Sequence, residues 1–342
     1  MYRYPIRQEG RYDRLRLDKN EHVSGFSEAI VQEMLQGISP HFLAAYPEPI
    51  ELYEKIAAWH NLELENVLIT SGSELAIRYL FEAYLDRGDT IVFANPSFAM
   101  FEVYATLCGA RIVNIDFQPD LTIDVDAFIG AIRRDAKIVA IANPNNPTGT
   151  VIAELDLCRI AETAAEFSAL VLVDEAYYHF YRNTMVDHLE DYDNLIVTRT
   201  FSKACGLASV RLGYALAHTE IVDSVRKLQP IDHANAFALK LGAYIVDHEE
   251  LIWDYVEQTE EGKSYLADEL SKKGFNTLTG YGNFLLVDAG EKHHQVVQEL
   301  QESGILVGAS IRLPFPNNYI RVTAGPIREM RRILCVLEGI DS

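Results

Sequence analysis

The feature that most constrains this chain is an alternation of short apolar runs with longer segments of helical pattern. Continuous runs rich in β-branched residues are typical of strands buried on both faces of a sheet. Helical segments between such strands indicate βαβ crossovers and a mostly parallel sheet. The seven runs are VLIT (67–70), TIVFA (90–94), RIVNID (111–116), KIVAIA (137–142), LVLVD (170–174), LIVTRT (195–200) and LGYALA (212–217). They predict an α/β domain with a seven-stranded sheet.

The pattern changes in the last third of the chain. Residues 236–273 have the pattern of one long helix. Strand-like runs follow at 283–289, 304–310 and 319–325, with a helical segment at 293–304 between the first two. This mixture is typical of an α+β unit rather than of continued βαβ crossovers.

The length of 342 residues exceeds the roughly 250–300 residues at which a single core stops growing. We therefore expect a large α/β domain over residues 31–235 and a smaller α+β domain over residues 236–342. Residues 1–30 contain no strand-and-helix unit of their own. We expect them to form an arm that packs on the small domain or on a partner subunit.

Charge and composition exclude several classes of protein. Lys and Arg total 30 and Asp and Glu total 50, a net charge of −20 that argues against nucleic-acid and polybasic membrane-surface binding. No run approaches the roughly 18 apolar residues of a membrane helix, and the first residues, MYRYPIRQEG, lack the apolar segment of a secretory signal. The four cysteines are widely spaced and form no metal-binding pattern. We expect a cytoplasmic protein without a metal site.

Ligands of open parallel sheets bind at the carboxyl ends of the strands, so the residues after each run are candidates. The turn 71–74 (SGSE) opens a helix after the first run, and its backbone N–H groups could hold an anion. An ordinary helix cap is the alternative. The loop 143–149 (NPNNPTG) is rigid because of its prolines, and it either fixes a side-chain amide or is a plain tight turn.

Two charged residues also follow buried runs. Asp174 ends the run 170–174, where it is either a functional carboxylate or a helix cap. Lys203 lies three residues after the run 195–200. A lysine near a buried strand end is costly unless it is paired or neutral, and such a lysine is a candidate for Schiff-base chemistry.

Taken together, these motifs resemble the fold-type I pyridoxal-phosphate (PLP) aminotransferases of classes I and II, and in particular the histidinol-phosphate aminotransferase-like branch. The resemblance covers essentially the whole chain. It rests on LDKNE (17–21), AYPEP (45–49), SGSE (71–74), NPNNPTG (143–149), VDEAYY (173–178), TRTFSKACGLASVRLGY (198–214) and YIRVTAG (319–325). The order and spacing of the motifs make the match specific.

The resemblance implies roles at the cofactor ring. Lys203 is expected to form the Schiff base with the cofactor and, once freed, to move the proton of the substrate α-carbon. Asp174 is expected to keep the pyridine nitrogen protonated. Asn146 and Tyr177 are expected to form hydrogen bonds with the phenolic oxygen of the cofactor, and Phe98 is expected to stack on its pyridine ring.

The resemblance also implies a phosphate site and a second subunit. Glu74 is expected to contribute its backbone N–H, since its carboxylate should avoid the phosphate. Tyr46 is expected to reach the phosphate of the neighbouring subunit, which implies a homodimer with shared active sites. The other phosphate-binding candidates are Ser73, Thr200, Ser202 and Arg211.

At the substrate end, Arg321 matches the family arginine that binds the substrate α-carboxylate, with Asn20 expected beside it and Asn146 contributing. The implied reaction transfers an amino group between a donor such as glutamate and a small oxo or phosphorylated keto substrate. The branch usually has an arginine for the substrate phosphate where this chain has Gly308 and Ala309, and Arg312 is the candidate replacement.

Two other functions remain open from the sequence. The same branch contains PLP-dependent decarboxylases of O-phospho amino acids, and the sequence does not decide which bond at the α-carbon is cleaved. A PLP-binding regulator is the other alternative. It predicts an added DNA-binding domain or a lost lysine, whereas Lys203 is present.

Overall fold

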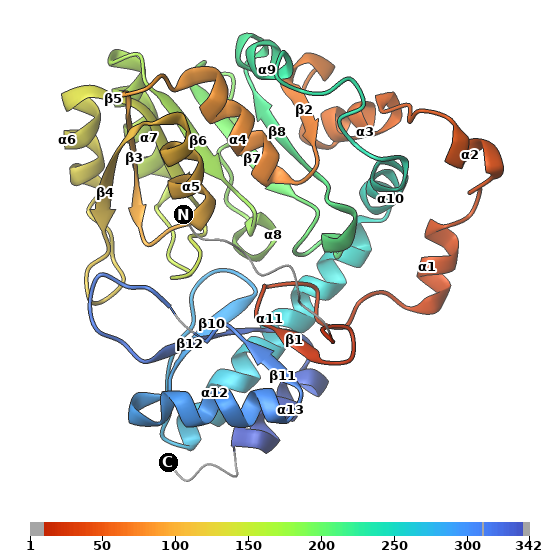
Figure 1. Cartoon of the computed structure of the whole chain (residues 1–342), viewed down its shortest axis with the longest axis vertical. Coiled ribbons are helices and arrows are strands. Elements are labelled where there is room, and N and C mark those ends of the chain that lie inside the picture. The colour runs from red at the N-terminus through yellow and green to blue at the C-terminus, as the bar shows by residue number, and fades with distance from the viewer. Residues whose placement is uncertain (1–9, 310, 338–342) are drawn as a thin grey trace.

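The computed structural model describes residues 10–309 and 311–337, so the first nine residues of the expected arm, Ser310 and the last five residues lie outside it. Its centre is a seven-stranded sheet in the order β2-β8-β7-β6-β5-β3-β4 (Figure 1). The strands are β2 (Val67–Thr70), β3 (Thr90–Asn95), β4 (Arg111–Asp116), β5 (Ala136–Ala142), β6 (Leu170–Asp174), β7 (Leu195–Thr200) and β8 (Gly213–Ala217). The seven predicted runs are confirmed as strands.

Strand direction in this sheet is mostly parallel, as predicted. The strands β3 to β7 pair in parallel, whereas β8 runs antiparallel to both of its neighbours, β2 and β7. Because β7 and β8 are antiparallel, the chain passes between them without a crossover helix. The connection between them contains Lys203 and Arg211.

Helices cover both faces of this sheet because successive strand residues point to opposite faces. Leu68, Ile138 and Leu172 pack in one core with α4 (Ser73–Tyr84), α5 (Ala99–Cys108) and α9 (Thr219–Arg226). Val139 and Val171 pack in the core on the other face. The helices that contribute to this second core include α3 (Ile50–His60), α6 (Val125–Asp135), α7 (Glu154–Glu166) and α10 (Ala236–Asp247).

A smaller unit with its own core lies below the large sheet in Figure 1. Its antiparallel sheet has the order β12-β10-β9, and a separate parallel pair joins β1 to β11. The strands are β1 (Leu15–Leu17), β9 (Asn276–Leu278), β10 (Phe284–Asp288), β11 (Ile305–Val307) and β12 (Tyr319–Thr323). The helices are α11 (Glu249–Lys272), α12 (His293–Glu302) and α13 (Ile327–Leu337). Three short helices complete the α-helices: α1 (Glu28–Met34), α2 (Pro40–Ala44) and α8 (Tyr178–Tyr181).

The expectation of one continuous helix over 236–273 is wrong. The chain leaves helical geometry at His248, with φ −127° and ψ 57°, and forms α10 and α11 on either side. No proline or glycine lies at this break, where the sequence has four consecutive polar residues, Asp247–Glu250. Among the described residues, no helix combines the length and apolar character needed to cross a membrane.

Candidate active site

A cavity of about 870 Å³ opens between the strand ends of the large sheet and the small unit. The large sheet contributes the end of β3, residues within β4 and the loop after β5, and the small unit contributes Arg321 of β12 and residues that follow β11. Five of the sequence-predicted site residues line it: Glu74, Phe98, Asn146, Lys203 and Arg321. Lys19 and Arg312 line it as well.

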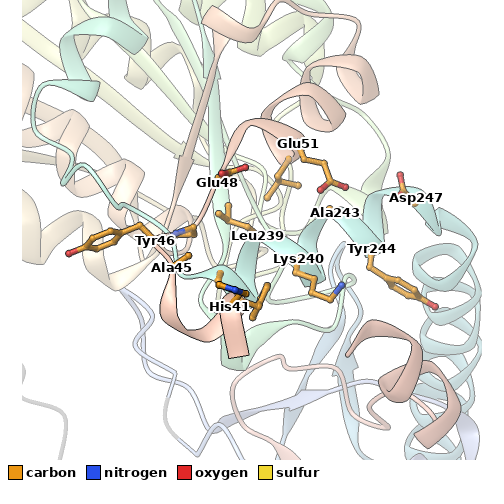
Figure 2. A pocket seen from close by; sticks show the side chains of 14 residues that line it. His41, Ala45, Tyr46, Glu48, Glu51, Leu239, Lys240, Ala243, Tyr244 and Asp247 are labelled. Carbon is orange, nitrogen blue, oxygen red and sulfur yellow. The ribbon is translucent and has the colours of Figure 1, made fainter. Parts of the chain in front are cut away.

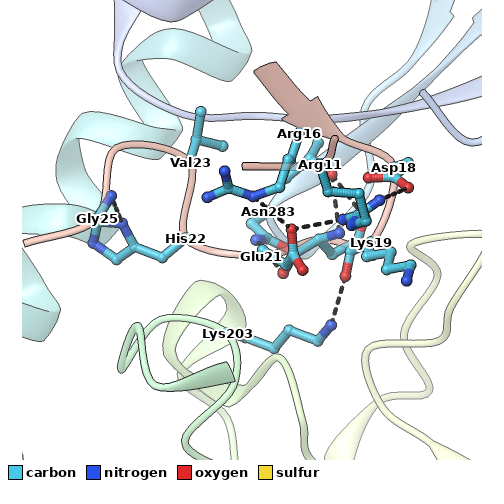
Figure 3. A network of polar contacts seen from close by, with 12 residues as sticks. Arg11, Arg16, Asp18, Lys19, Glu21, His22, Val23, Gly25, Lys203 and Asn283 are labelled. Carbon is cyan, nitrogen blue, oxygen red and sulfur yellow. Dashed lines mark hydrogen bonds and ion pairs between the residues drawn. The ribbon is translucent and has the colours of Figure 1, made fainter. Parts of the chain in front are cut away.

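Lys203 projects from the β7–β8 connection toward the N-terminal segment (Figure 3). Its Nζ donates a hydrogen bond to the backbone carbonyl of Lys19 at 2.8 Å. Burial, together with the positive charge of Arg321, lowers the pKa of Lys203 to about 8. With this pKa, roughly a tenth of the amine is neutral at pH 7. The neutral amine is the form that attacks a carbonyl carbon.

Asp174 is the last residue of β6 and is buried. Its Oδ1 accepts a hydrogen bond from the Thr198 hydroxyl on β7 at 2.9 Å. Burial raises the pKa of Asp174 to about 6, and the hydrogen bonds from Thr198 and from the backbone of Ala176 oppose that rise. A buried carboxylate of this kind is a suitable partner for a protonated ring nitrogen.

Tyr177 is buried and its hydroxyl oxygen accepts a hydrogen bond from Asn20 Nδ2 at 2.8 Å. Asn20 is itself held by Thr323 at the end of β12, which accepts from the Asn20 backbone N–H at 3.0 Å. Its φ of 56° is in the left-handed region, which asparagine tolerates better than most residues. The Tyr177 hydroxyl accepts from Asn20 and can therefore still donate its own proton to a ligand.

An anion cradle lies at the N-terminus of α4, where the first backbone N–H groups have no partner within the helix. The Arg211 guanidinium lies so close that a Cβ on Gly72 would be 2.8 Å from its Nη2. Arg211 Nη1 donates to the Ser202 hydroxyl at 3.3 Å, and the Ser202 backbone donates to the Thr200 hydroxyl at 3.1 Å. A helix N-terminus with hydroxyls and a guanidinium suits a phosphate group. Ser73, the first residue of α4, belongs to this cradle.

Glu74 follows in the same first turn of α4, and two neighbours hold its carboxylate. Oε1 accepts a hydrogen bond from the Tyr104 hydroxyl at 2.7 Å, and Oε2 lies 3.8 Å from Arg211 Nη2. The partner Tyr104, on α5, was not anticipated from the sequence.

Arg321 on β12 is held at its two terminal nitrogens. Nη1 donates to Asn146 Oδ1 at 2.5 Å, and Nη2 donates to the backbone carbonyl of Asp18 at 2.6 Å. These two acceptors are uncharged, and a substrate carboxylate would bind the guanidinium more strongly than either of them. In the N-terminal segment, Arg321 donates to the backbone carbonyl of Asp18, whereas the Asn20 side chain contacts Tyr177 and Thr323.

Phe98 and Tyr46 lie in different surroundings. Phe98 lines the cavity just before α5, and its ring packs edge-on against Phe101 at 5.8 Å between centroids. Tyr46 is 82% exposed and lines a separate cavity, where its ring points away from the other labelled side chains (Figure 2). Within one chain, the structure therefore brings together the predicted site residues other than Tyr46.

Sequence reasoning missed several contributors to the site. Thr198 had a signal, because Thr198 and Thr200 alternate in β7 and so point to the same face of the sheet. Asp18 and Lys19 belong to the motif LDKNE, but their contacts are made through backbone carbonyls, which the residue types do not predict.

These residues fit pyridoxal phosphate. The cradle at α4 can hold its phosphate, Asp174 can pair with its ring nitrogen, and Lys203 supplies the amine for its aldehyde. When bound, the cofactor provides an electron sink for the α-carbon of an amino acid.

Comparison with known proteins gives the family. Residues 13–337 match the family model of class I and II aminotransferases. A histidinol-phosphate aminotransferase of Clostridium novyi is 30% identical, covering 98% of this chain and 94% of that protein. Another, from Symbiobacterium thermophilum, is 34% identical, covering 97% and 92%.

Solved structures share the fold. A structure titled as a putative histidinol-phosphate aminotransferase from Erwinia carotovora atroseptica has a TM-score of 0.86, with 23% identity and 96% of both chains covered. The Sinorhizobium meliloti histidinol-phosphate aminotransferase, in complex with pyridoxal-5'-phosphate, has a TM-score of 0.84, with 22% identity and 95% and 91% coverage. The decarboxylase alternative finds no support in these comparisons. The chain belongs to the class I and II aminotransferases and is a PLP-dependent transaminase.

Proposed function

We propose that this enzyme moves an amino group between an amino-acid donor such as glutamate and a small phosphorylated keto substrate, as a histidinol-phosphate aminotransferase does. The observation that carries the proposal is that Lys203, Arg321 and Arg312 line one cavity. The two cations match the two substrates, because the amino-acid donor carries an α-carboxylate and the keto substrate carries a phosphate, and the amine is needed for both half-reactions.

Each residue has a defined task in this proposal. Lys203 Nζ accepts the proton of the substrate α-carbon, because its lowered pKa leaves a neutral amine available. Arg321 binds the α-carboxylate through its two Nη atoms, and Asn146 keeps the guanidinium in place. Asp174 keeps the ring nitrogen of the cofactor protonated.

Arg312 is proposed to bind the distal phosphate of the substrate. Gly308 occupies the place of the usual arginine and forms two backbone hydrogen bonds with Arg321, at 2.8 and 2.9 Å. A Cβ at Gly308 would lie 3.2 Å from the Arg321 Cβ, so a small residue suits this crossing. Arg312 is exposed on the loop that follows and faces the same cavity.

We also propose that the enzyme is a homodimer. Three adjoining cavities of about 480 to 540 Å³ lie over residues 41–53 and 226–247, away from the cavity that contains Lys203. Large apolar side chains stay exposed on this surface, among them Leu43, Ile50, Ile231 and Tyr46. Exposed apolar surface of this extent marks an interaction site, and a second copy would cover it. This placement supports the role of Tyr46 at the phosphate of the partner.

The decisive experiment is a screen of amino donors that follows the visible absorbance of the bound cofactor. L-glutamate and histidinol phosphate should each abolish the band, and Lys203→Ala should lack the normal band. If histidinol phosphate is inert while another donor converts the cofactor, the phosphorylated substrate is misassigned. Protein that takes up no added PLP would contradict the whole proposal.

A cytoplasmic location stays a prediction, for which the free cysteines are the support.

A further inference from the structure

A buried lysine holds a turn of the small unit. Lys263 on α11 has 8% of its side chain exposed. Its Nζ donates to the backbone carbonyls of Gly282 at 2.9 Å and Gly280 at 3.2 Å, and to the Glu260 carboxylate at 2.9 Å. Both carbonyls belong to the turn between β9 and β10. The ammonium group therefore fixes the turn that leads into the sheet carrying Arg321.

This turn packs directly against the loop that carries Asn146. The Tyr281 backbone N–H donates to the carbonyl of Gly149 at 2.8 Å. A Cβ on Gly280 would lie 2.6 to 2.7 Å from backbone atoms of Gly149, so only glycine allows this approach. The two backbones are thus in contact, and a shift of the turn must move the loop or break the hydrogen bond.

The residue before Lys263 contacts the same end of this sheet, where the start of β10 pairs with the end of β12. A Cβ on Gly262 would lie 1.8 Å from the carbonyl oxygen of Gly325, which follows β12 by two residues. Two residues into the sheet from this end, Leu286 of β10 is the partner of Arg321 on β12. Adjacent residues of α11 therefore hold the start of β10 and the end of β12.

We propose that Lys263 is a positioning residue for Arg321. It sets the distance between the Arg321 guanidinium and Asn146. Lys263 is not among the residues that line the cavity, so it acts through the turn, through Gly149 and through the sheet. The inference rests on the proposed function of Arg321 as the site of the substrate α-carboxylate. It does not involve the phosphate cradle or Asp174.

The test is Lys263→Met in the PLP-bound enzyme, with α-methylglutamate as the probe. This compound carries the α-carboxylate but has no α-hydrogen, so a spectral titration measures its binding rather than turnover. We expect its dissociation constant to rise about tenfold, as for a coupled residue outside a site. In single turnovers with L-glutamate, the apparent dissociation constant should rise similarly, while the maximal rate constant stays within about twofold. The affinity for PLP should not change.

The same helix offers a matched control. Lys272 also pairs with a glutamate three residues earlier, Glu269, but is 69% exposed. Lys272→Met should leave both dissociation constants unchanged. Lys263→Arg keeps a cation with several donors and should recover most of the binding.

Further variants separate the outcomes. If Lys263→Met fails to fold, Gly280→Ala tests the same contact and should weaken α-methylglutamate binding. Gly130→Ala, where an added methyl would meet no atom within 4 Å, is its control. Folded, PLP-loaded Lys263→Met or Gly280→Ala with wild-type binding would overturn the inference. Arg321→Lys with wild-type binding would instead show that the carboxylate site itself is misassigned.

Discussion

The Nζ of Lys203 lies 2.8 Å from the backbone carbonyl oxygen of Lys19, so a lysine of the large sheet is in contact with the N-terminal segment. The neighbouring carbonyl, that of Asp18, accepts from Arg321. One short piece of backbone thus borders both the amine and the carboxylate-binding cation. Arg11 and Arg16 brace this piece through ion pairs with Glu21 (Figure 3).

The reactivity of Lys203 should follow its lowered pKa. The amine is neutral above about pH 8, so the rate at which the apoenzyme takes up PLP should rise through that pH and level off above it. Arg321→Gln removes a positive charge that lowers the pKa of Lys203, so the midpoint should move to higher pH. Stopped-flow absorbance across pH measures both. A midpoint that does not move would show that the charge of Arg321 does not contribute to the lowered pKa of Lys203.

The ionised side chain of Asp174 should lower the free energy of unfolding of the apoprotein at neutral pH. Its pKa is about 6 in the folded protein against 3.8 as the reference, so folding favours the protonated form. The stabilisation that comes from protonating Asp174 in the folded protein is fully present below about pH 3.8 and is lost as pH rises through 6. Asp174→Asn should therefore stabilise the apoprotein at pH 7 by about 3 kcal/mol, by linkage.

Urea unfolding of both apoproteins at pH 7 and pH 4.5 measures the effect, which should shrink at the lower pH. The same variant should bind PLP more weakly, because the ring nitrogen loses its anionic partner. Equal stabilisation at both pH values would mean that the gain has another origin.

Thr198→Val should lower the affinity for PLP without affecting Arg321, the residue proposed to bind the substrate carboxylate. Removing the hydroxyl that donates to Asp174 takes away a hydrogen bond to a charged group, worth about 1.5 kcal/mol or more. The dissociation constant for PLP should rise roughly tenfold. Thr198→Ser, which keeps the donor, is the control, and titration of apoenzyme by absorbance measures both. Unchanged affinity in Thr198→Val would argue against a role for this hydrogen bond.

Arg312→Gln should discriminate between substrates. The KM for histidinol phosphate should rise by about 30-fold or more, because a charge-assisted contact to the phosphate is lost. The KM for L-glutamate should stay within about twofold, since Arg321 is untouched. Arg328→Gln, at a 77% exposed side chain on α13, is the control. An equal loss for both substrates would show that Arg312 does not read the phosphate.

Ile231→Asp should disrupt the proposed dimer. Its side chain is 95% exposed in the single chain, so the substitution leaves the core of the monomer unchanged. Sedimentation velocity should show a shift from dimer to monomer, with weaker PLP binding because Tyr46 no longer reaches a partner. A wild-type protein that sediments as a monomer would contradict the proposal directly.

The sequence predicted the large sheet well because buried parallel strands are continuous apolar runs that few other structures produce. Lys203 and Asp174 could be named as candidates because charged residues near the ends of such runs are unusual, but their roles came from the resemblance and stay predictions. The short strands β1 and β9 were not, because three residues carry no periodicity. The contacts of Asp18 and Lys19 depend on where the backbone passes, and side-chain patterns do not encode that.

The reversed direction of β8 has a consequence for how the site is assembled. Residues 201–212 connect β7 to the antiparallel β8, so Lys203 and Arg211 lie in one connection with both ends anchored in the sheet. Gly213 at the far end packs so tightly that a Cβ there would lie 2.2 Å from the Ser73 backbone nitrogen. The connection therefore fixes the distance between the Lys203 amine and the anion cradle. Lengthening it by one residue should mismatch the two ends of the cofactor, even if every side chain of the site is kept.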